Sequence, residues 1–330
     1  MQTKVVSQEI CVDIHNNGAT LPARGEFAAK PIAFSDPALT LDDIKEVLEH
    51  ITKGGTTLIL PTIMTTARAV VIRNCALIAA AMEQPWGAAI GGIHLEGPFI
   101  NLETKGAHPA QHVEEMVDFS FIEKVFESAK GRIALITLSP ALSKVLPFIE
   151  AICKLGVEVS LGHHTANSTQ IEEAINAGAR GITHLGNAGL KPLAGKGEVL
   201  LASLASGNDT YVMLIPDGTH ISNHYIRFAS TIVENLRRGH TIWVSDSSPL
   251  ATAPEGTKWR YDGRLSTVIK DDITGALRPD PLSGSYLLLP QCLAWLRKEK
   301  LVSEELVVAG SNQNPLNFLR IPLERIKGSL

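Results

Sequence analysis

Short apolar runs alternate with longer segments of helical periodicity along most of the chain. In Leu41–Lys53 the apolar side chains recur at every third or fourth position, and charged residues occupy the positions between them. This spacing predicts an amphipathic helix. Gly54 and Gly55 follow directly, as is typical of a helix C-terminus. The apolar runs between such segments are shorter and rich in β-branched residues, which favours buried strands.

Eight runs are predicted strands: Glu9–Ile14, Thr57–Leu60, Ala88–Leu95, Arg132–Leu138, Val157–Leu161, Gly181–Thr183, Thr210–Ile215 and Thr241–Val244. Eight segments are predicted helices: Leu41–Lys53, Ala67–Glu83, Phe119–Ala129, Ser143–Leu155, Thr169–Ala177, Val199–Ala205, Asn223–Arg237 and Tyr286–Lys298. Eight βα units in this order predict a (β/α)8 TIM-type barrel, with an irregular segment over Ser247–Leu282. The alternative is an open doubly wound sheet. It would require a glycine-rich phosphate turn after the first strand, where the chain has His15-Asn16-Asn17-Gly18.

Composition narrows the class of protein. The chain has 330 residues, of which 45% are hydrophobic and 19% charged, so it can bury a large core and is not a disordered protein. Thirty basic residues stand against 34 acidic ones, which gives no indication of a surface for nucleic acid or an anionic membrane. No apolar run approaches the ~20 residues of a membrane span.

The chain shows no internal boundary and no targeting signal. Because no linker rich in proline, glycine or serine divides it, we expect residues 1–330 to form one hydrolase barrel domain. The N-terminus has no long apolar segment or small-residue cleavage site, so we expect no signal peptide. The four cysteines lie far apart in sequence, which favours a reducing, cytoplasmic location over a disulfide framework.

Polar residues suited to chemistry follow most of the predicted strands. They are Asp13, His15, His94, Glu96, His163, His164, His184, Asp217, His220 and Asp246, and include six of the eleven histidines. In a barrel the carboxyl ends of all strands open on one face, which carries the active site. Histidines and carboxylates gathered there have the composition of a metal site.

The residues themselves leave several roles open. Glu96 is either a metal ligand or a buried carboxylate paired with a histidine, and His94 is better placed as a core or supporting residue. His163 and His164 are adjacent and cannot both face the barrel axis, and the pattern of the preceding strand does not choose between them. His184 is a candidate ligand.

Asp246 is a candidate general base, although a helix N-cap or a buried ion-pair partner is the alternative. One carboxylate and two imidazoles suit a divalent ion such as Zn²⁺ and leave a position for water, so the chemistry indicated is metal-assisted hydrolysis. The other histidines considered are interpreted as solvated surface residues: His50, His112, His224 and His240.

Several motifs together resemble the N-acetylglucosamine-6-phosphate deacetylase family of the amidohydrolase superfamily. They appear in family order from near residue 11 to residue 320 and are specific as a set. The motifs are His94-Leu95-Glu96-Gly97-Pro98-Phe99, Lys105-Gly106-Ala107-His108-Pro109, Ser160-Leu161-Gly162-His163, Thr183-His184-Leu185 with Asn187-Ala188, Asp217-Gly218-Thr219-His220, Val244-Ser245-Asp246 and Leu282-Ser283-Gly284-Ser285.

The resemblance implies a site and a reaction. It implies one divalent metal, zinc by preference, held by Glu96, His163 and His184, with Asp246 as general base and acid and His108 polarising the acetyl carbonyl. The family removes acetate from N-acetylglucosamine 6-phosphate, and a phosphate-binding residue from a neighbouring subunit implies a homodimer. The implied substrate-binding residues are Ala107, Asn187, Ala188, Lys196, Asp217, His220, Leu282, Ser283 and Gly284.

The chain departs from the family pattern at several places. Relatives usually carry a small β-sandwich built from both chain ends, so we expect a barrel-only variant. At the first strand the chain has His15-Asn16-Asn17 where many relatives have His-x-His, which favours one metal and leaves His15 and Asn17 as weaker candidate ligands. Lys196 replaces the phosphate-binding arginine. Gly186 stands where a bulky aromatic residue is usual, and Ala141 where glutamate is frequent.

Because most of these departures surround the substrate, two other functions stay open. One is an amide hydrolase of the same mechanism that acts on a different N-acyl sugar or a cyclic amide. The other is a barrel that has lost catalysis and serves as a binding protein. Metal content separates the second from the enzymes, and a panel of N-acetylated sugars with and without a 6-phosphate separates the substrates.

Overall fold

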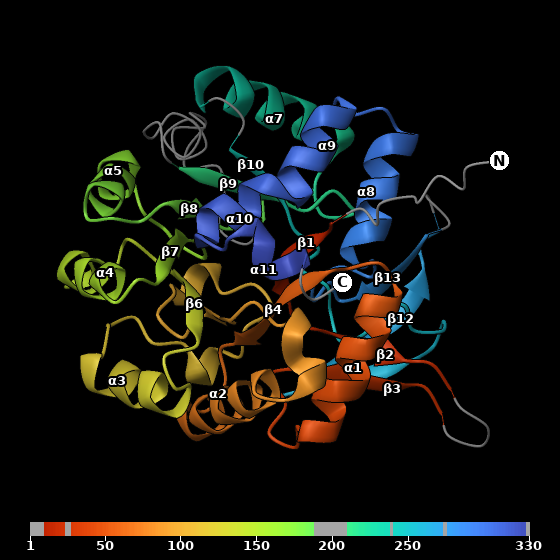
Figure 1. The fold of residues 1–330 in the computed structure, drawn as a ribbon, viewed down its shortest axis with the longest axis horizontal. Coiled ribbons are helices and arrows are strands. Elements are labelled where there is room, and N and C mark those ends of the chain that lie inside the picture. Colours follow the sequence, from red (N-terminus) through yellow and green to blue (C-terminus); the bar gives the residue numbers. More distant parts are fainter. Residues whose placement is uncertain (1–9, 24–27, 188–209, 238–239, 273–275, 328–330) are drawn as a thin grey trace.

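The computed structural model describes residues 10–23, 28–187, 210–237, 240–272 and 276–327 (Figure 1). Eight strands form one sheet in which every pair of hydrogen-bonded neighbours is parallel. They are β1 (Val12–Asn16), β4 (Leu58–Met64), β5 (Ile93–Glu96), β6 (Ile133–Leu138), β7 (Glu158–Leu161), β8 (Gly181–Ile182), β9 (Tyr211–Leu214) and β10 (Thr241–Trp243).

The last strand returns to the first at their carboxyl ends. The Asp246 amide donates to the His15 carbonyl at 2.9 Å, and the Asn17 amide donates to the Ser247 carbonyl at 3.1 Å. Asp13 adds side-chain bonds, because its carboxylate accepts from the Ser245 hydroxyl at 2.6 Å and from the Ser245 amide at 3.1 Å. These bonds close the sheet into the predicted (β/α)8 barrel.

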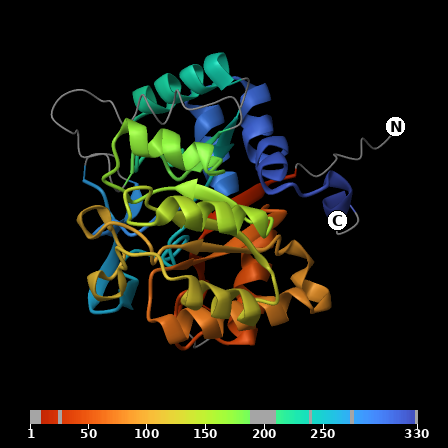
Figure 2. The ribbon, with the colours of Figure 1, turned by 90° about the vertical axis from the view of Figure 1, so that its left-hand side faces the viewer.

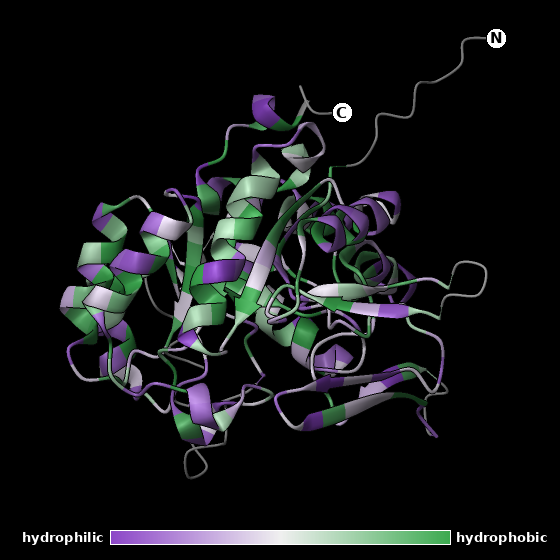
Figure 3. Cartoon of the chain, turned by 90° about the horizontal axis from the view of Figure 1, so that it is seen from below, coloured by the Kyte–Doolittle hydropathy of each residue, from purple (hydrophilic) through white to green (hydrophobic). Residues whose placement is uncertain are grey.

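Helices surround the strands in the order expected. They are α1 (Leu41–Lys53), α2 (Arg68–Met82), α3 (Phe119–Ser128), α4 (Val145–Lys154), α5 (Ser168–Asn176), α7 (Asn223–Arg237) and α8 (Leu289–Lys298). Helix α1 begins with a capping box between Thr40 and Asp43 and buries its apolar stripe. Figure 3 shows the mixed hydropathy of the outer helices. The helix expected at Val199–Ala205 lies outside the described residues.

Three further helices follow α8 and were not predicted: α9 (Glu304–Ser311), α10 (Gln313–Leu319) and α11 (Leu323–Lys327). Leu316 and Phe318 of α10 pack in one buried cluster with the strand residues Val12, Leu58 and Leu135. In Figure 1, α10 and α11 lie across the strands. The amino end of the barrel is therefore covered by apolar side chains.

Two predictions of local structure were wrong. The strand expected from Ala88 begins only at Ile93, because Pro85–Ala89 forms a 3-10 helix (η1). The segment Ser247–Leu282 is not irregular throughout, since it contains an antiparallel sheet of β11 (Lys258–Tyr261), β12 (Arg264–Lys270) and β13 (Leu277–Asp280).

A second small sheet also escaped prediction. It pairs β2 (Gly18–Leu21) with β3 (Lys30–Ala33), directly after the first barrel strand. The remaining short elements are the 3-10 helices η2 (Leu102–Thr104) and η3 (Ala110–His112). In Figure 2 the gold loop that contains η2 and η3 lies beside the blue β11–β13 region at one end of the barrel.

Candidate metal centre and active site

A cavity of about 330 Å³ lies at the carboxyl ends of the strands, within the range of small-molecule sites. Among the described residues its lining is Asn17, Met64, Glu96, Gly106, Ala107, His108, His163, His184, Asn187, His220, Asp246, Arg264, Leu282, Ser283 and Gly284. Residues from seven barrel strands or the loops after them therefore converge on one cavity.

Glu96, His163 and His184 form a compact cluster of donor atoms. Glu96 Oε1 lies 3.1 Å from His163 Nε2 and 3.0 Å from His184 Nε2, and the two Nε2 atoms are 3.1 Å apart. Ligands about 2.0–2.2 Å from a tetrahedral Zn²⁺ lie roughly 3.3–3.5 Å from one another, so this triangle needs only a small expansion to become one face of such a site. All three residues are buried, and the cluster fits a divalent ion.

The orientation of His163 suits a ligand. Its Nδ1 faces the Thr104 carbonyl oxygen at 3.0 Å, and because a carbonyl only accepts, Nδ1 carries the proton. Nε2 then presents its lone pair to the cluster, as a ligating imidazole requires. His164 points elsewhere, and its Nδ1 accepts from the Ala166 amide at 3.3 Å.

Charge at the cluster is concentrated on Glu96 and His15. Burial alone would raise the pKa of Glu96, but the charge of His15 and the contact from His108 hold that pKa well below its usual range. Burial lowers the pKa of His184. Deprotonated carboxylate and neutral imidazole are the forms that bind a metal.

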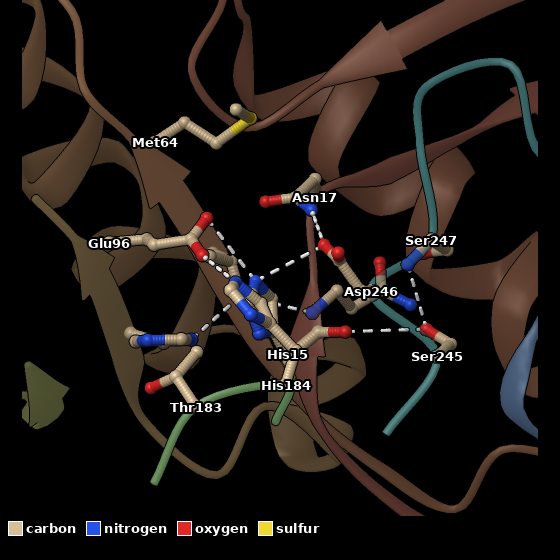
Figure 4. A network of polar contacts seen from close by, with 12 residues as sticks. His15, Asn17, Met64, Glu96, Thr183, His184, Ser245, Asp246 and Ser247 are labelled. Carbon is tan, nitrogen blue, oxygen red and sulfur yellow. Dashed lines mark hydrogen bonds and ion pairs between the residues drawn. The ribbon is translucent and has the colours of Figure 1, made fainter. Parts of the chain in front are cut away.

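Asp246 lies on the opposite side of His15 from Glu96 (Figure 4). His15 Nε2 is 3.3 Å from Glu96 Oε2 and 3.2 Å from Asp246 Oδ1. The Asn17 amide group donates to the same Asp246 oxygen at 2.7 Å. Among the described residues, no hydrogen bond or ion pair engages the second oxygen, Oδ2, and Asp246 lines the cavity. Asp246 is followed by a loop, so it is not a helix N-cap.

His94 is a buried residue outside the cavity lining. Its Nδ1 lies 3.1 Å from Thr62 Oγ1 and its Nε2 2.8 Å from Thr137 Oγ1, so both ring nitrogens have partners. Its ring meets that of His15 edge to face at 4.7 Å. His94 therefore supports the position of His15, in agreement with the supporting role expected from the sequence.

His108 comes from the loop between η2 and η3 and is held by Thr65. The Thr65 amide donates to His108 Nδ1 at 3.3 Å, which leaves the proton of the neutral ring on Nε2. Nε2 lies 3.5 Å from Glu96 Oε2. Burial lowers the pKa of His108 to about 4, so the ring is neutral at pH 7. Gly97 permits this approach, because a Cβ there would lie 2.2 Å from Thr65 Oγ1.

Asp217 does not line the cavity, contrary to the direct substrate contact expected from the resemblance. Its Oδ1 accepts from the amides of Thr219 and His220 at 2.8 and 2.9 Å, and its Oδ2 faces His220 Nδ1 at 2.7 Å and accepts from Ser285 Oγ at 2.8 Å. Both oxygens are thus occupied. Asp217 orients His220, whose Nε2 is left for the cavity.

The turn Leu282–Gly284 passes close to Asp246. Ser285 N donates to the Asp246 carbonyl at 2.7 Å, and a Cβ on Gly284 would lie 2.7 Å from that same oxygen. Glycine is therefore required for this approach. Ser283 Oγ and Asn17 Oδ1 are buried and have no hydrogen-bond partner among the described residues, so both are available to a bound molecule in the cavity they line.

Sequence reasoning missed three lining residues: Met64, Gly106 and Arg264. Met64 could have been found, because it ends a barrel strand. Arg264 could not, because its hairpin was interpreted as irregular. Ala188 and Lys196 lie outside the described residues, so their predicted roles stay predictions.

The departures at Gly186 and Ala141 have different surroundings. Gly186 has a φ of +96°, and a Cβ there would lie 2.9 Å from Ile221 Cγ2 and 3.0 Å from Tyr225 Cε1. The ring of Tyr225 on α7 therefore occupies the space beside this position. Ala141 packs against the main core and lies outside the cavity lining.

Of the four histidines interpreted as solvated, His224 is exposed. The others are partly buried and have partners, which corrects the interpretation. His50 contacts Thr252 Oγ1 at 3.1 Å, and His112 forms an ion pair with Asp262 at 3.0 Å. His240 stacks on the Tyr211 ring at 4.6 Å.

Within the described ranges, no helix is both long and apolar enough to cross a membrane. The chain matches no family model. It is 30% identical over 295 residues to the N-acetylglucosamine-6-phosphate deacetylase of Bos taurus, covering 86% of this chain and 69% of that protein. It is 28% identical over 288 residues to the N-acetylgalactosamine-6-phosphate deacetylase of Shewanella sp. (strain ANA-3), with coverage of 86% and 69%.

Solved structures agree on the fold. The N-acetyl-D-glucosamine-6-phosphate deacetylase of Mycobacterium smegmatis superposes with a TM-score of 0.81 at 23% identity, covering 95% of this chain and 78% of that one. The enzyme of Pasteurella multocida gives a TM-score of 0.80 at 22% identity, with coverage of 95% and 76%. By sequence and fold together, the chain belongs to the N-acetylglucosamine-6-phosphate deacetylase family, whose members hydrolyse an amide C–N bond.

Proposed function

We propose that this protein releases acetate from an N-acetyl amino sugar 6-phosphate, with N-acetylglucosamine 6-phosphate as the first candidate. The observation that carries the proposal is the triangle of Glu96, His163 and His184 in a cavity that also presents Asp246 and His108. This is the set of groups that amide hydrolysis needs: a metal site, a base and a donor to the carbonyl.

Glu96, His163 and His184 would hold one divalent ion, and zinc fits a set of one carboxylate and two imidazoles. Such an ion supplies Lewis acidity and lowers the pKa of water at the site. His15 lies outside the three-residue cluster, which supports the single-ion interpretation.

Asp246 acts first as a base and then as an acid. Asn17 and His15 hold Oδ1, so Oδ2 accepts the proton of the attacking water. The same carboxyl then returns a proton to the departing amine nitrogen, which must be protonated to leave as an amine. His108 donates from Nε2 to the acetyl oxygen as negative charge develops there.

The sugar would contact His220, Asn187 and the Leu282–Gly284 turn, with the unpartnered Ser283 hydroxyl as a donor. Ala188 and Lys196 complete the expected phosphate contacts. The resemblance further supports a homodimer, and four cysteines that form no disulfide in the described part of the chain support a cytoplasmic location. We further propose that residues 1–330 form one domain.

N-acetylgalactosamine 6-phosphate is the second candidate, because a relative of equal coverage carries that name. The two sugars differ only in configuration at C4, and a site that hydrogen-bonds a hydroxyl discriminates strongly against its absence or misplacement. The departures at Gly186 and Ala141 also leave other N-acyl sugars as candidates.

The test is acetate release by the purified, metal-loaded protein. The substrates are N-acetylglucosamine, N-acetylgalactosamine and the 6-phosphate of each. We expect the highest kcat/KM with a 6-phosphate, and loss of activity on chelation with recovery on adding back Zn²⁺. A protein that binds metal and releases no acetate from any of the four would contradict the proposal.

A further inference from the structure

Arg264 places a guanidinium in the cavity from outside the eight barrel strands. It is the first residue of β12, and its Nη2 donates to the Leu282 carbonyl oxygen at 3.0 Å. Leu282, Ser283 and Gly284 line the same cavity. One donor group thus fixes the side chain against this turn, and the other N–H groups have no hydrogen bond to a described residue of the cavity.

The hairpin that carries Arg264 is fixed to the loops of the active site. Asp262 and Gly263 form its two-residue turn with φ of +46° and +86°, as a type I′ turn requires. The Tyr261 hydroxyl donates to the Thr65 carbonyl at 2.8 Å, and Asp262 pairs with His112 at 3.0 Å. Thr65 also holds His108. The position of Arg264 is therefore set relative to His108.

The charge of Arg264 is not neutralised by an ion pair within the described part of the chain. Arg68 and Arg278, by contrast, each pair with two carboxylates. Of the described residues that line the cavity, Arg264 is the one with a permanent positive charge, and it is half-buried. A partly desolvated guanidinium with free donors recognises oxyanions strongly.

We propose that Arg264 is the anion-recognising residue of this cavity and binds an oxyanion of the substrate or product. The shared chemistry is a group with two or three equivalent oxygens, which a guanidinium grips with two parallel N–H donors. Two sources fit it: the 6-phosphate of the sugar and the carboxylate of the released acetate. The inference rests on the proposed function for the identity of these sources.

Binding titrations of the metal-loaded protein test the inference. The probes are glucosamine 6-phosphate, glucosamine and acetate, and the variants are Arg264→Gln and Arg260→Gln. Arg260 is the matched control, because it lies on the same hairpin and outside the cavity lining. We expect Arg264→Gln to weaken one anionic probe about 10- to 100-fold, the value of a charge-assisted hydrogen bond, and Arg260→Gln to leave every Kd unchanged.

The three probes show which oxyanion Arg264 binds. Weakening confined to glucosamine 6-phosphate assigns Arg264 to the phosphate, and weakening confined to acetate assigns it to the carboxylate. Unchanged affinity for both anions overturns the inference. An equal loss of affinity for glucosamine, which carries no phosphate, also overturns it. Arg264→Lys keeps the charge but lacks the two parallel N–H donors of the guanidinium, so it should retain part of the affinity. This variant keeps the test valid if the glutamine variant folds poorly.

Failure of the proposed function gives a different result. If the wild-type protein releases no acetate from any N-acetyl hexosamine, the function fails. The effect of Arg264→Gln on the binding of the two anions still decides whether this residue recognises an oxyanion.

Discussion

The two ends of the barrel each bury a glutamate, and the partners of the two carboxylates differ in kind. At the amino end, Glu158 pairs with Arg180 at 3.1 Å and Arg320 at 3.0 Å. At the carboxyl end, Glu96 faces imidazoles: His15, His108, His163 and His184. Arginine is always charged and has no lone pair to offer a metal, whereas a neutral imidazole has one.

The pKa values of the two glutamates separate accordingly. Burial raises the pKa of Glu158, and the two arginines offset only part of that rise. Glu96 is more deeply buried, yet the charge of His15 and the contact from His108 hold its pKa well below the usual range. The first arrangement stabilises a closed end of the barrel. The second keeps an ionised carboxylate beside ring nitrogens in an open cavity.

The largest effect should come from removing a ligand at the open end. His184→Ala should reduce bound metal from about one ion per chain to near zero, because a three-ligand site loses most of its affinity with any member. Acetate release should fall by at least about 10³-fold, since the ion supplies several kcal/mol. Elemental analysis and an acetate assay measure both. Full metal occupancy in this variant would refute the ligand set, and two ions in the wild type would refute the single-metal interpretation.

Asp246→Asn should reduce kcat by about 10²- to 10⁴-fold, because asparagine keeps the shape but cannot accept the proton. Metal content should stay at the wild-type value, in contrast to His184→Ala. If kcat persists in the asparagine variant, Asp246 has a structural role and another group is the base.

The Asp217–His220 pair predicts a pH window for stability. The pKa of His220 lies above its ordinary value of 6.5, because the charge of Asp217 outweighs burial. The stability that His220 contributes is therefore full below pH 6.5 and lost as pH rises through the raised pKa. The pKa of Asp217 lies below 3.8, because hydrogen bonds and His220 outweigh burial, so its contribution is full above 3.8 and lost as pH falls through the lowered pKa.

The unfolding free energy of the wild type should therefore exceed that of His220→Gln by the largest margin between pH 3.8 and 6.5. Denaturant titrations at a series of pH values measure this difference. A margin that is constant across the whole pH range would show that the pair carries no titrating charge.

The same pair predicts an effect on kinetics. Asp217→Asn should lower kcat/KM about 10- to 100-fold with metal retained, since His220 loses a charge-assisted hydrogen bond.

The smallest effect on activity should come from the closed end. Glu158→Gln should lower the free energy of unfolding by about 1–3 kcal/mol, because two arginines lose their buried partner but remain partly exposed. Metal content and kcat/KM should not change. A loss of metal in this variant would show that the two ends of the barrel are coupled, and would contradict their separate roles.

Periodicity predicted the barrel well, because long helices and buried parallel strands carry strong patterns. The bounds of Leu41–Lys53 and Asn223–Arg237 agree with the structure. The strands β11–β13 were missed, since they are short, polar on one face and paired with one another rather than with the barrel. Their Asp262-Gly263 turn was the available signal.

Candidate site residues followed from their place at strand ends, but their orientation did not. Asp217 lies at such an end, yet its oxygens are occupied by Thr219, His220 and Ser285. Arg264 is the opposite case, because no pattern distinguishes it from other charged residues and a hairpin brings it to the cavity. Such placements depend on contacts between segments far apart in sequence, which local patterns do not encode.

The bonds that close the barrel also place the general base, whereas the metal cluster does not depend on them. Glu96 ends β5, and His163 and His184 follow β7 and β8, so the triangle forms within the continuous stretch from 93 to 184. Asp246 reaches its place only when its amide meets the His15 carbonyl and Asn17 meets its carboxylate. A molecule that folded without joining its last strand to its first would have a complete metal cluster and no aligned base. Closure of the barrel between β10 and β1 is therefore the step that brings the general base into line with the metal cluster.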